Sequence, residues 1–303
     1  MISVILSTYN ESLFEVKRCI DSILEQTYQD IEVIIICDNP DNIPITNYLH
    51  TIIDNRVRVY YNEKNQGLVY CLNYALSLAN GDYIARMNAD DISIKDRFCK
   101  QLDYLLDNNL DIIGSWTKLI NEEGNEIGDA IFPTTYQTIK RQIKHFNCLA
   151  HPTWFGKKKV FDDAAGYRNI KYCEDYDFIL RILLKGYKVG NIPEYCLYYQ
   201  IRATSITRGN LAEQKIRTRY LAKLKPGELN DLTAINSYFQ SQEYKQSVND
   251  YKNYNNILML IRQGKLRFVF TLVFNKNTYY ALVDKVRLKS VYQKELKNRS
   301  LKK

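Results

Sequence analysis

Two clusters of acidic side chains have the residue types and the spacing to do chemistry. The first, residues 88–91, reads Asn-Ala-Asp-Asp and follows a strand-like segment over residues 82–86. The second, residues 174–177, reads Glu-Asp-Tyr-Asp and stands at the head of a helical pattern over residues 178–185. Carboxylates where a strand ends can hold a divalent metal on a phosphate, and carboxylates across a cleft can act as a base. The pair predicts an enzyme that acts on a nucleotide-linked substrate.

Strands and helices that alternate over the first hundred residues must position the first cluster. Apolar and β-branched runs predict strands at residues 2–7, 31–36, 57–61 and 83–86. Apolar residues at helical spacing predict helices at residues 13–25, 45–53 and 68–78. This order is typical of a parallel sheet with right-handed crossovers, which binds ligands at the carboxyl ends of its strands.

Polar side chains follow all four of these strands. They are Thr8, Tyr9, Asn10 and Glu11 after the first, Asp38 after the second, residues 62–67 after the third, and residues 88–91 after the fourth. We therefore expect one site at this edge of the sheet. The first loop has no glycine and a Walker loop is absent, which argues against a nicotinamide-binding Rossmann domain and a P-loop. A phosphate bound without such a loop needs another positive partner, and a metal held by Asp90 is the simplest one.

The second half of the chain has a less regular pattern. Strands are predicted at residues 111–119, 151–155 and 195–201, and helices at residues 135–146, 160–165 and from about 211 onward. The chain is 46% apolar and 25% charged, which is ordinary for a globular α/β protein. One large domain with an extension is expected for this length.

The cysteines and the apolar runs bear on the cellular compartment. The seven cysteines are scattered and form no C-x-x-C pair, which argues against a disulfide framework or a zinc site and for a reducing compartment. The first residues read as a strand and not as a signal peptide. No run approaches the roughly 18 apolar residues that a membrane span needs. We expect a cytoplasmic protein.

Positive charge is concentrated at the end of the chain. Residues 261–303 hold twelve Lys or Arg and two acids, whereas the whole chain has a net charge of +8, so residues 1–260 are slightly acidic. A basic segment with interleaved aromatic and apolar residues can bind an anionic membrane surface. Nucleic acid and a plain solvated helix are the alternatives. We expect the membrane surface as partner, and no nucleic acid.

The motifs, taken in this order, resemble the family 2 glycosyltransferases of the GT-A fold over roughly residues 1–207. The resemblance implies an α/β fold, a Rossmann-like mixed sheet flanked by helices, as in nucleotide-diphospho-sugar transferases. Residues 208–303 would then be a helical, basic C-terminal extension. A nucleotidyltransferase is the nearest rival, but it normally has a glycine- and lysine-bearing first loop.

The resemblance implies a set of donor-binding residues. Asp38 matches the aspartate that hydrogen-bonds the uracil or its ribose, and Arg86 precedes the family's D-x-D metal motif at residues 88–90. Arg86 either holds the diphosphate or pairs with Asp90 or Asp91. The full nucleotide-sugar set is Thr8, Tyr9, Asn10, Glu11, Asp38, Asn65, Gly67, Asn73, Arg86, Asn88, Asp90 and Arg202.

Two residues depart from the family pattern. Asn88 stands where the D-x-D motif has its first aspartate, and an amide oxygen ligates a hard cation without adding negative charge. We therefore expect Mg²⁺ or Mn²⁺ to bind Asp90 and Asn88 more weakly. Arg202 stands where the family often has a histidine that faces the diphosphate, and its cation is expected to do part of the metal's work.

The resemblance implies an inverting single displacement with Glu174 and Asp175 as the catalytic pair. Asp175 would take the proton of the acceptor hydroxyl, because neighbouring carboxylates raise its proton affinity. Acidic residues at a helix start can also simply stabilise the helix dipole. His151, Trp154 and Asp177 are assigned to the acceptor, although a tryptophan in such a segment is equally often a core residue.

The expected reaction transfers one hexose per encounter, because residues 200–204 lack the Q-x-x-R-W motif of processive synthases. The donor would be a UDP-sugar carrying galactose, glucose or an N-acetylhexosamine. The acceptor would be an undecaprenyl-diphosphate-linked glycan in O-antigen or capsule assembly, at the inner face of the cell membrane. The alternative is a non-catalytic nucleotide-sugar-binding protein whose metal site has degraded at Asn88.

Overall fold

The structure is a computed structural model that describes residues 1–202 and 210–262, with the single positions 290, 293 and 295. It divides into two compact units. The first comprises Met1–Ile139, Cys148–Asn169 and Arg181–Arg202, and the second comprises Lys140–Asn147, Ile170–Leu180 and Ala203–Lys303. The predicted boundary at residue 207 and most of the basic segment 261–303 lie outside the described residues and stay predictions.

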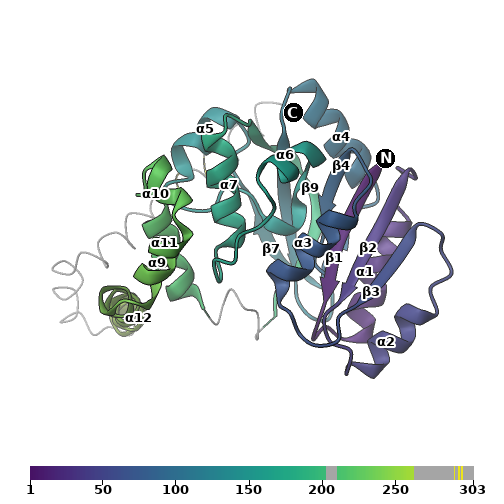
Figure 1. The fold of residues 1–303 in the computed structure, drawn as a ribbon, viewed down its shortest axis with the longest axis horizontal. Coiled ribbons are helices and arrows are strands. Elements are labelled where there is room, and N and C mark those ends of the chain that lie inside the picture. The colour runs from purple at the N-terminus through teal and green to yellow at the C-terminus, as the bar shows by residue number, and fades with distance from the viewer. Residues whose placement is uncertain (203–209, 263–289, 291–292, 294, 296–303) are drawn as a thin grey trace. The chain divides into compact units, whose positions relative to one another are not determined.

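The first unit is built on one mixed sheet, which within the described residues has nine strands (Figure 1). Its order is β3 (Val57–Tyr61), β2 (Ile31–Cys37), β1 (Ile2–Thr8), β4 (Tyr83–Arg86), β8 (Phe155–Lys157), β6 (Ile112–Ile120), β9 (Val189–Gln200) and β5 (Ile92–Ser93), with β7 (Glu126–Ala130) paired to β6. The first four strands in sequence are parallel, as predicted. β8 runs antiparallel to β4, so the sheet is mixed, as the resemblance implied.

The described part of the chain also contains α-helices. They are α1 (Leu13–Leu24), α2 (Ile43–His50), α3 (Leu68–Leu78), α4 (Arg97–Asp107), α5 (Tyr136–Gln142), α6 (Lys158–Asp163), α7 (Glu174–Leu184), α9 (Leu211–Leu221), α10 (Pro226–Asn230), α11 (Leu232–Gln240) and α12 (Gln242–Arg262). The predicted helices at residues 13–25, 45–53 and 68–78 are confirmed as α1, α2 and α3. The helical character expected from residue 211 is confirmed for α9 to α12.

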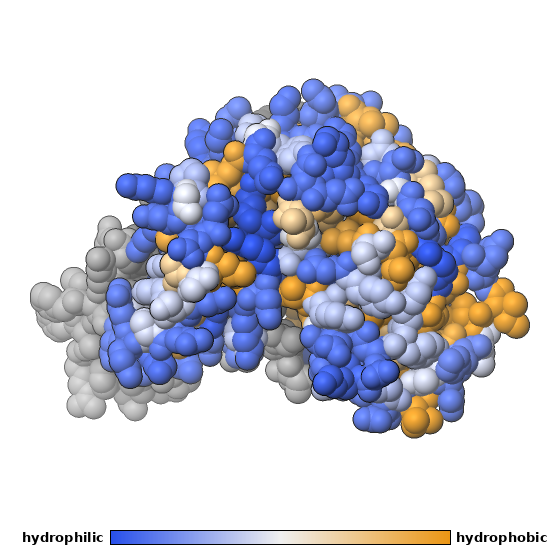
Figure 2. Space-filling view, in the orientation of Figure 1, coloured by the Kyte–Doolittle hydropathy of each residue, from blue (hydrophilic) through white to orange (hydrophobic). Residues whose placement is uncertain are grey.

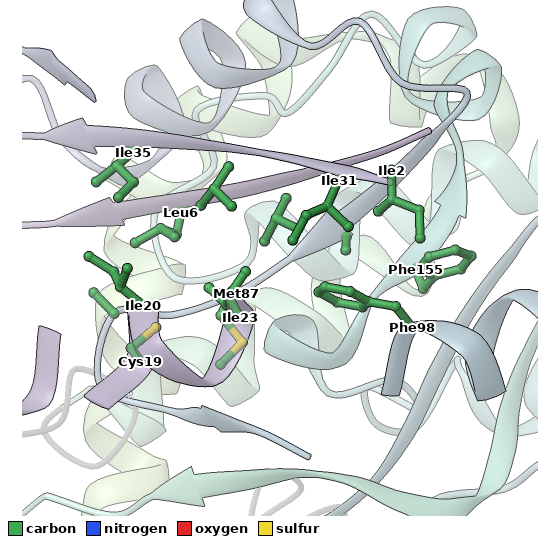
Figure 3. Close-up of a cluster of buried hydrophobic side chains, with 14 of the residues drawn as sticks. Ile2, Leu6, Cys19, Ile20, Ile23, Ile31, Ile35, Met87, Phe98 and Phe155 are labelled. Atoms are coloured by element: carbon green, nitrogen blue, oxygen red, sulfur yellow. The ribbon is translucent and has the colours of Figure 1, made fainter. Parts of the chain in front are cut away.

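The core of the first unit lies on the face of β1 and β2 that α1 covers (Figure 3). Alternate residues of β1, such as Ile2 and Leu6, pack with Ile20 and Ile23 of α1 and with Phe98 of α4. The opposite face of both strands is buried too, because α3 lies against β1 and β2. Burial on both faces explains why these strands read as continuous apolar runs.

Residues 151–155 differ from the prediction of a strand. The structure has a short 3₁₀ helix over His151–Thr153, and strand β8 begins only at Phe155. Pro152 has no backbone N–H for a strand ladder, but it fits the first turn of a helix. The helix predicted over residues 135–146 is shorter as well, and ends at Gln142.

The second unit contains a cluster of aromatic rings among its C-terminal helices. Tyr220 of α9 stacks on Tyr238 of α11 with ring centroids 3.8 Å apart. The Arg217 guanidinium lies 4.3 Å from the centroid of the Phe239 ring, and its Nε donates to the Tyr244 hydroxyl at 2.9 Å. Stacking and cation–π contacts of this kind hold α9, α11 and α12 together.

The surface is mostly hydrophilic on the face shown in Figure 2. The large apolar side chains that are exposed come from separate elements, among them Phe14 of α1 and Ile43 of α2. Over the ranges that the structure describes, no helix is long and apolar enough to cross a membrane. The basic tail proposed as a membrane contact falls almost wholly outside those ranges.

Glu32 of β2 is a buried acceptor that joins several segments of the first unit. Its carboxylate accepts hydrogen bonds from the Ser3 hydroxyl at 2.5 Å and the Asn80 backbone N–H at 2.6 Å, and it pairs with Arg58 of β3. Burial by itself would raise the pKa of Glu32, but the bonds from Ser3 and Asn80 and the Arg58 charge outweigh it, so this pKa is lowered. The ionised carboxylate therefore stabilises the fold.

We expect Glu32→Ala to lower the free energy of unfolding by about 3 kcal/mol, because Ser3 and Arg58 lose a charged partner. Urea denaturation measures this loss, with exposed Glu63→Ala as the control. The folded pKa lies below the unfolded one, so the contribution of ionisation is complete above the unfolded pKa and is lost as the pH falls through the folded pKa. An equal loss in the Glu63 variant would contradict the assignment.

Candidate active site

Asp38 organises the loop that leads into α3. The carboxylate is 4% exposed; Oδ1 accepts from Asn62 Nδ2 at 2.7 Å and from the Gln66 backbone N–H at 2.8 Å, and Oδ2 accepts from the Gly67 N–H at 2.9 Å. Gly67 caps α3 with a φ of +86°, a conformation that favours glycine. The structure thus brings Asp38 and Gly67 together, whereas Asn65 of the same loop is exposed. The sequence analysis placed residues 62–67 at this edge of the sheet, but it did not single out Asn62 and Gln66 as partners of Asp38.

The first loop is folded around Glu11. Glu11 Oε2 accepts hydrogen bonds from the Thr8 hydroxyl at 2.8 Å and from the Tyr9 backbone N–H at 2.6 Å. Asn39, just after Asp38, donates to the Tyr9 carbonyl and to Asn10 Oδ1, both at 3.1 Å. The ends of β1 and β2 therefore meet, as expected from parallel strands. The Tyr9 ring is 42% exposed, which leaves a face for a base to stack on.

Asn73 has its hydrogen bonds within the fold. Its amide exchanges two bonds with the backbone of Tyr167, at 2.8 and 2.9 Å. Gly166 next to it has a φ of +67°, and a Cβ there would come within 2.4 Å of Asn73 Oδ1. These contacts give Asn73 a role in holding the turn at residues 166–167. Its assignment to the nucleotide stays a prediction.

The acidic cluster at residues 88–91 divides into a buried and a more open carboxylate. Asp91 is 1% exposed and accepts from Asn88 Nδ2 at 2.8 Å and from the Gln200 backbone N–H at 2.9 Å, so it fixes the loop to the end of β9. Asp90 is more exposed. Burial raises the pKa of Asp90 to about 6; the Arg202 charge opposes this rise and the Glu11 charge adds to it.

Arg202 is the cation of this cluster. Its Nη2 lies 2.9 Å from Glu15 Oε2, and its Nε lies 3.3 Å from Asp90 Oδ2. Burial would raise the pKa of Glu15, but hydrogen bonds from Ser12 and the Arg202 charge outweigh burial and lower it. One guanidinium therefore neutralises a carboxylate from α1 and another from the β4 loop.

Gln200 extends the network back to α1. Its side-chain amide donates to Glu15 Oε1 and accepts from Arg18 Nη2 at 2.5 Å. The sequence interpretation missed Glu15, Arg18 and Gln200 as members of the site. Glu15 carried one signal, because Ser12 and Glu15 form a capping box that marks the start of α1. Nothing local links the capping box to Arg202.

The side chains at residues 88–90 suit a hard cation only in part. Asp90 and Asn88 offer carboxylate and amide oxygens, the donors that Mg²⁺ and Mn²⁺ prefer, and magnesium is often held by one or two carboxylates plus substrate phosphates. Among the residues that the structure describes, no three His, Cys, Asp or Glu side chains are placed to share a metal ion. The donor set fits a cation that the diphosphate of a substrate helps to hold.

A second group of predicted site residues in the first unit is buried: Arg86, His151 and Trp154. Two guanidinium nitrogens of Arg86, Nε and Nη1, are buried and have no hydrogen-bond partner in the described part of the chain. His151 Nε2 lies 3.0 Å from the Tyr167 hydroxyl, and burial together with the Arg86 charge lowers the pKa of His151. Trp154 has no exposed surface and packs on His151 and Tyr167.

The burial of Trp154 favours core packing over direct acceptor contact, the alternative that the sequence left open. His151 is also buried, and it is neutral because its pKa is lowered. Both assignments to the acceptor stay predictions. No ion pair of Arg86 with Asp90 or Asp91 occurs within the described residues. The two guanidinium nitrogens of Arg86 without a hydrogen-bond partner favour the other alternative, an anionic ligand such as the diphosphate.

Asp175 belongs to the second unit, in the first turn of α7. Its Oδ2 accepts a hydrogen bond from Asn147 Nδ2 at 2.7 Å, and its Oδ1 accepts from the Tyr176 backbone N–H at 2.7 Å. Tyr176 is itself held by a bond from its hydroxyl to the Ile143 carbonyl at 2.5 Å. The two donors fix the plane of the carboxylate. Asn147 was missed in the sequence, since nothing local marks it.

The neighbours of Asp175 differ in exposure. Glu174 is half-buried, as a residue that meets a ligand would be. Asp177 has no exposed surface, and its backbone N–H bonds to the Cys173 carbonyl at 2.9 Å. Complete burial favours a structural role for Asp177, and its assignment to the acceptor stays a prediction.

With this geometry established, comparison with known proteins decides the family. The chain matches the model of "Glycosyl transferase family 2" over residues 3–164, more than half of its length. It belongs to glycosyltransferase family 2. The resemblance drawn from the motifs is confirmed, and so is the enzyme class: the protein is a glycosyltransferase.

Two bacterial glycosyltransferases have sequences related to this chain. The O-antigen biosynthesis glycosyltransferase WbnJ of Escherichia coli is 39% identical over 216 residues, which cover 70% of this chain and 84% of WbnJ. The amylovoran biosynthesis glycosyltransferase AmsE of Erwinia amylovora is 28% identical, over 68% of this chain and 77% of AmsE.

Solved structures confirm the GT-A fold of this family 2 enzyme. TarS 1–349 of S. aureus in complex with UDP-GlcNAc has a TM-score of 0.56 at 17% identity, over 82% of this chain and 79% of that one. The mannosyltransferase PcManGT of Pyrobaculum calidifontis, in complex with GDP-Man and Mn²⁺, has a TM-score of 0.57 at 14% identity, over 97% of this chain and 86% of that one. At these identities the likeness shows the fold alone.

We expect Asp38→Ala to loosen the 62–67 loop, because Asn62, Gln66 and Gly67 lose their shared acceptor. Hydrogen exchange of peptides covering this loop should become faster, and the free energy of unfolding should fall by about 2 kcal/mol. Exposed Asp41→Ala is the matched control. Unchanged exchange in the Asp38 variant would show that the loop is held by other contacts.

Proposed function

We propose that this glycosyltransferase is an inverting, non-processive enzyme that moves a hexose from a UDP-sugar to a hydroxyl of a lipid-linked oligosaccharide in O-antigen or capsule biosynthesis. The observation that carries the proposal is the likeness to WbnJ, which names O-antigen biosynthesis and of which this chain covers 84%. The transferred hexose is galactose, glucose or an N-acetylhexosamine.

The loops at the carboxyl ends of β1, β2 and β4 are the proposed donor site. Support for a uridine nucleotide comes from TarS, which shares the fold and was solved with UDP-GlcNAc and with UDP. Tyr9 offers an exposed ring to the uracil, and Asp38 fixes the loop beneath it. Arg86 and Arg202 supply positive charge for the diphosphate, since a phosphate is bound well by guanidinium groups.

Asp175 is the proposed base. The acceptor hydroxyl gives its proton to the Asp175 carboxylate while its oxygen attacks the anomeric carbon, and the bond from that carbon to the diphosphate breaks on the opposite side. Asn147 and the Tyr176 N–H hold the carboxylate in one orientation, as a positioned base requires.

Mg²⁺ or Mn²⁺ is the proposed cofactor, with Asp90 and Asn88 as its ligands. The bound cation would offset the charge that develops on the leaving diphosphate. Support comes from the oxygen donors at residues 88–90 and from PcManGT, a protein of the same fold solved with Mn²⁺. Arg202 already faces Asp90, so part of the positive charge is supplied by the chain itself.

The proposed acceptor is a glycan linked to undecaprenyl diphosphate, and the proposed location is the inner face of the cell membrane. The O-antigen and amylovoran relatives support a polysaccharide pathway. The basic segment 261–303 would bind anionic lipid there. The alternative of a non-catalytic nucleotide-sugar-binding protein rests on Asn88, and the first test below separates the two.

Release of UDP from a panel of UDP-sugars, with and without Mn²⁺, tests the function. We expect one donor to turn over, Mn²⁺ to stimulate turnover, and Asp175→Asn to lower the rate by at least about a hundredfold, the typical contribution of a general base. Exposed Asp103→Asn is the control. Tight donor binding without turnover, even with a lipid-diphosphate acceptor present, would favour the binding protein.

Arg202→Ala tests the charge balance at Asp90. We expect the donor Kd to rise about tenfold or more, because the diphosphate loses a charge-assisted contact. The Mn²⁺ dependence should become steeper in the same variant, since Asp90 then has no cation of the chain beside it. Arg56→Ala removes a guanidinium paired with Asp54 instead and is the matched control. Unchanged donor affinity would refute the role of Arg202.

A further inference from the structure

A small cavity of about 70 Å³ opens beside Asp175, entirely within the second unit. Asn147 and Asp175 line one wall, and Gln214, Lys215 and Thr218 of α9 line the other. The volume exceeds what a single buried water needs. The lining includes side chains that can hydrogen-bond a hydroxylated ligand, among them Asn147, Asp175 and Gln214.

The wall formed by α9 is fixed by contacts to the segment before α7. Gln214 Nε2 donates to the Tyr172 carbonyl at 3.2 Å, and Cys173 Sγ donates to the Gln214 carbonyl at 3.5 Å. Cys173 Sγ also lies 3.6 Å from the Thr218 hydroxyl. The cavity is therefore a built feature of the unit and not a gap between loosely packed helices.

The backbone of one lining residue, Tyr172, is strained. Its φ is +67°, a left-handed conformation that is unfavourable for a bulky residue. Such strain persists where surrounding contacts enforce it, and it is found most often at functional sites. At this position Gln214 donates a hydrogen bond to the Tyr172 carbonyl.

The side chains that line the cavity argue against a nucleophilic cysteine and favour the binding of a sugar. Burial raises the pKa of the Cys173 thiol far above its usual range, so this cysteine is not a thiolate nucleophile. Gln214 offers a carbonyl oxygen, Oε1, that accepts no hydrogen bond from any residue the structure describes, and Lys215 adds an ammonium donor to the same wall. Amides, an ammonium group and a tyrosine ring are groups that recognise sugars.

We propose that this cavity receives the attacking hydroxyl of the acceptor sugar together with its neighbouring hydroxyl, and that Gln214 and Lys215 of α9 determine which acceptor is used. The proposal rests on Asp175 being the base of the proposed function. The attacking hydroxyl gives its proton to Asp175 as its oxygen forms the new glycosidic bond and UDP leaves. The adjacent hydroxyl donates to Gln214 Oε1 and accepts from Lys215.

The test uses the full-length enzyme and p-nitrophenyl glycosides of glucose, galactose and their N-acetylhexosamines as acceptors. Saturation-transfer NMR first identifies the glycosides that bind the wild type, and UDP release then gives KM for glycoside and donor separately. We expect Gln214→Ala to raise KM for the accepting glycoside about tenfold, the effect of losing one or two hydrogen bonds, while KM for the donor changes less than about twofold.

Two further variants make the result specific. Lys215→Met should raise the same KM without removing the bond to Tyr172, so it answers the objection that Gln214→Ala distorts the loop. Gln240→Ala, an exposed glutamine at the end of α11, should leave both KM values unchanged. An acceptor lacking the adjacent hydroxyl should bind wild type and Gln214→Ala equally weakly.

The outcomes separate this inference from the proposed function. If the wild type releases UDP from a donor but Gln214→Ala and Lys215→Met keep the wild-type KM for the glycoside, α9 does not select the acceptor. Failure of every glycoside to bind the wild type at tens of millimolar also overturns the acceptor cavity. If no donor turns over at all, the proposed function itself fails.

Discussion

The proposed donor site of this enzyme depends on one electrostatic constraint, the gathering of carboxylates at the ends of parallel strands. Chain topology puts Glu11 and Asp90 at one edge of the sheet, and α1 adds Glu15. Burial raises the pKa of Asp90 to about 6, and the charges of Glu11 and Glu15 add to that rise. Arg202 opposes it, because its guanidinium lies within ion-pair distance of both Glu15 and Asp90. Removal of one partner from such a pair leaves an uncompensated charge, which is costly in a partly buried site.

This constraint explains why the departures at residues 88 and 202 belong together. A second aspartate at position 88 would add negative charge beside Asp90 and Asp91, whereas Asn88 instead donates a hydrogen bond to Asp91. A histidine at position 202 would be a weaker cation than arginine near neutral pH. With Asn88 and Arg202 in place of an aspartate and a histidine, more of the positive charge beside Asp90 comes from the chain itself and less from a metal ion. In the proposed donor site, the guanidinium of Arg202 lies beside Asp90, the carboxylate that would also hold a divalent cation.

The sequence predicted the parallel order of β1 to β4 and the loops at their ends, because both follow from local periodicity and from the geometry of parallel sheets. It could not predict partners set by tertiary contacts. Gln200 reaches Glu15 across most of the chain, and Asn73 bonds to the Tyr167 backbone, contacts that no local pattern encodes. Trp154 shows a related limit of sequence analysis. An aromatic residue near a site motif can either pack in the core or bind a ligand, and only its complete burial in the structure favours packing.

In the second unit, two neutral donors bind the carboxylate of Asp175, the proposed base. Asn147 Nδ2 donates to Oδ2 of this carboxylate, and the Tyr176 N–H donates to Oδ1. The segment before α7 is held in turn by Gln214 of α9, through Tyr172. Helices that follow the family 2 match at residues 3–164 therefore contribute to the surroundings of the proposed base as well as to the C-terminal fold.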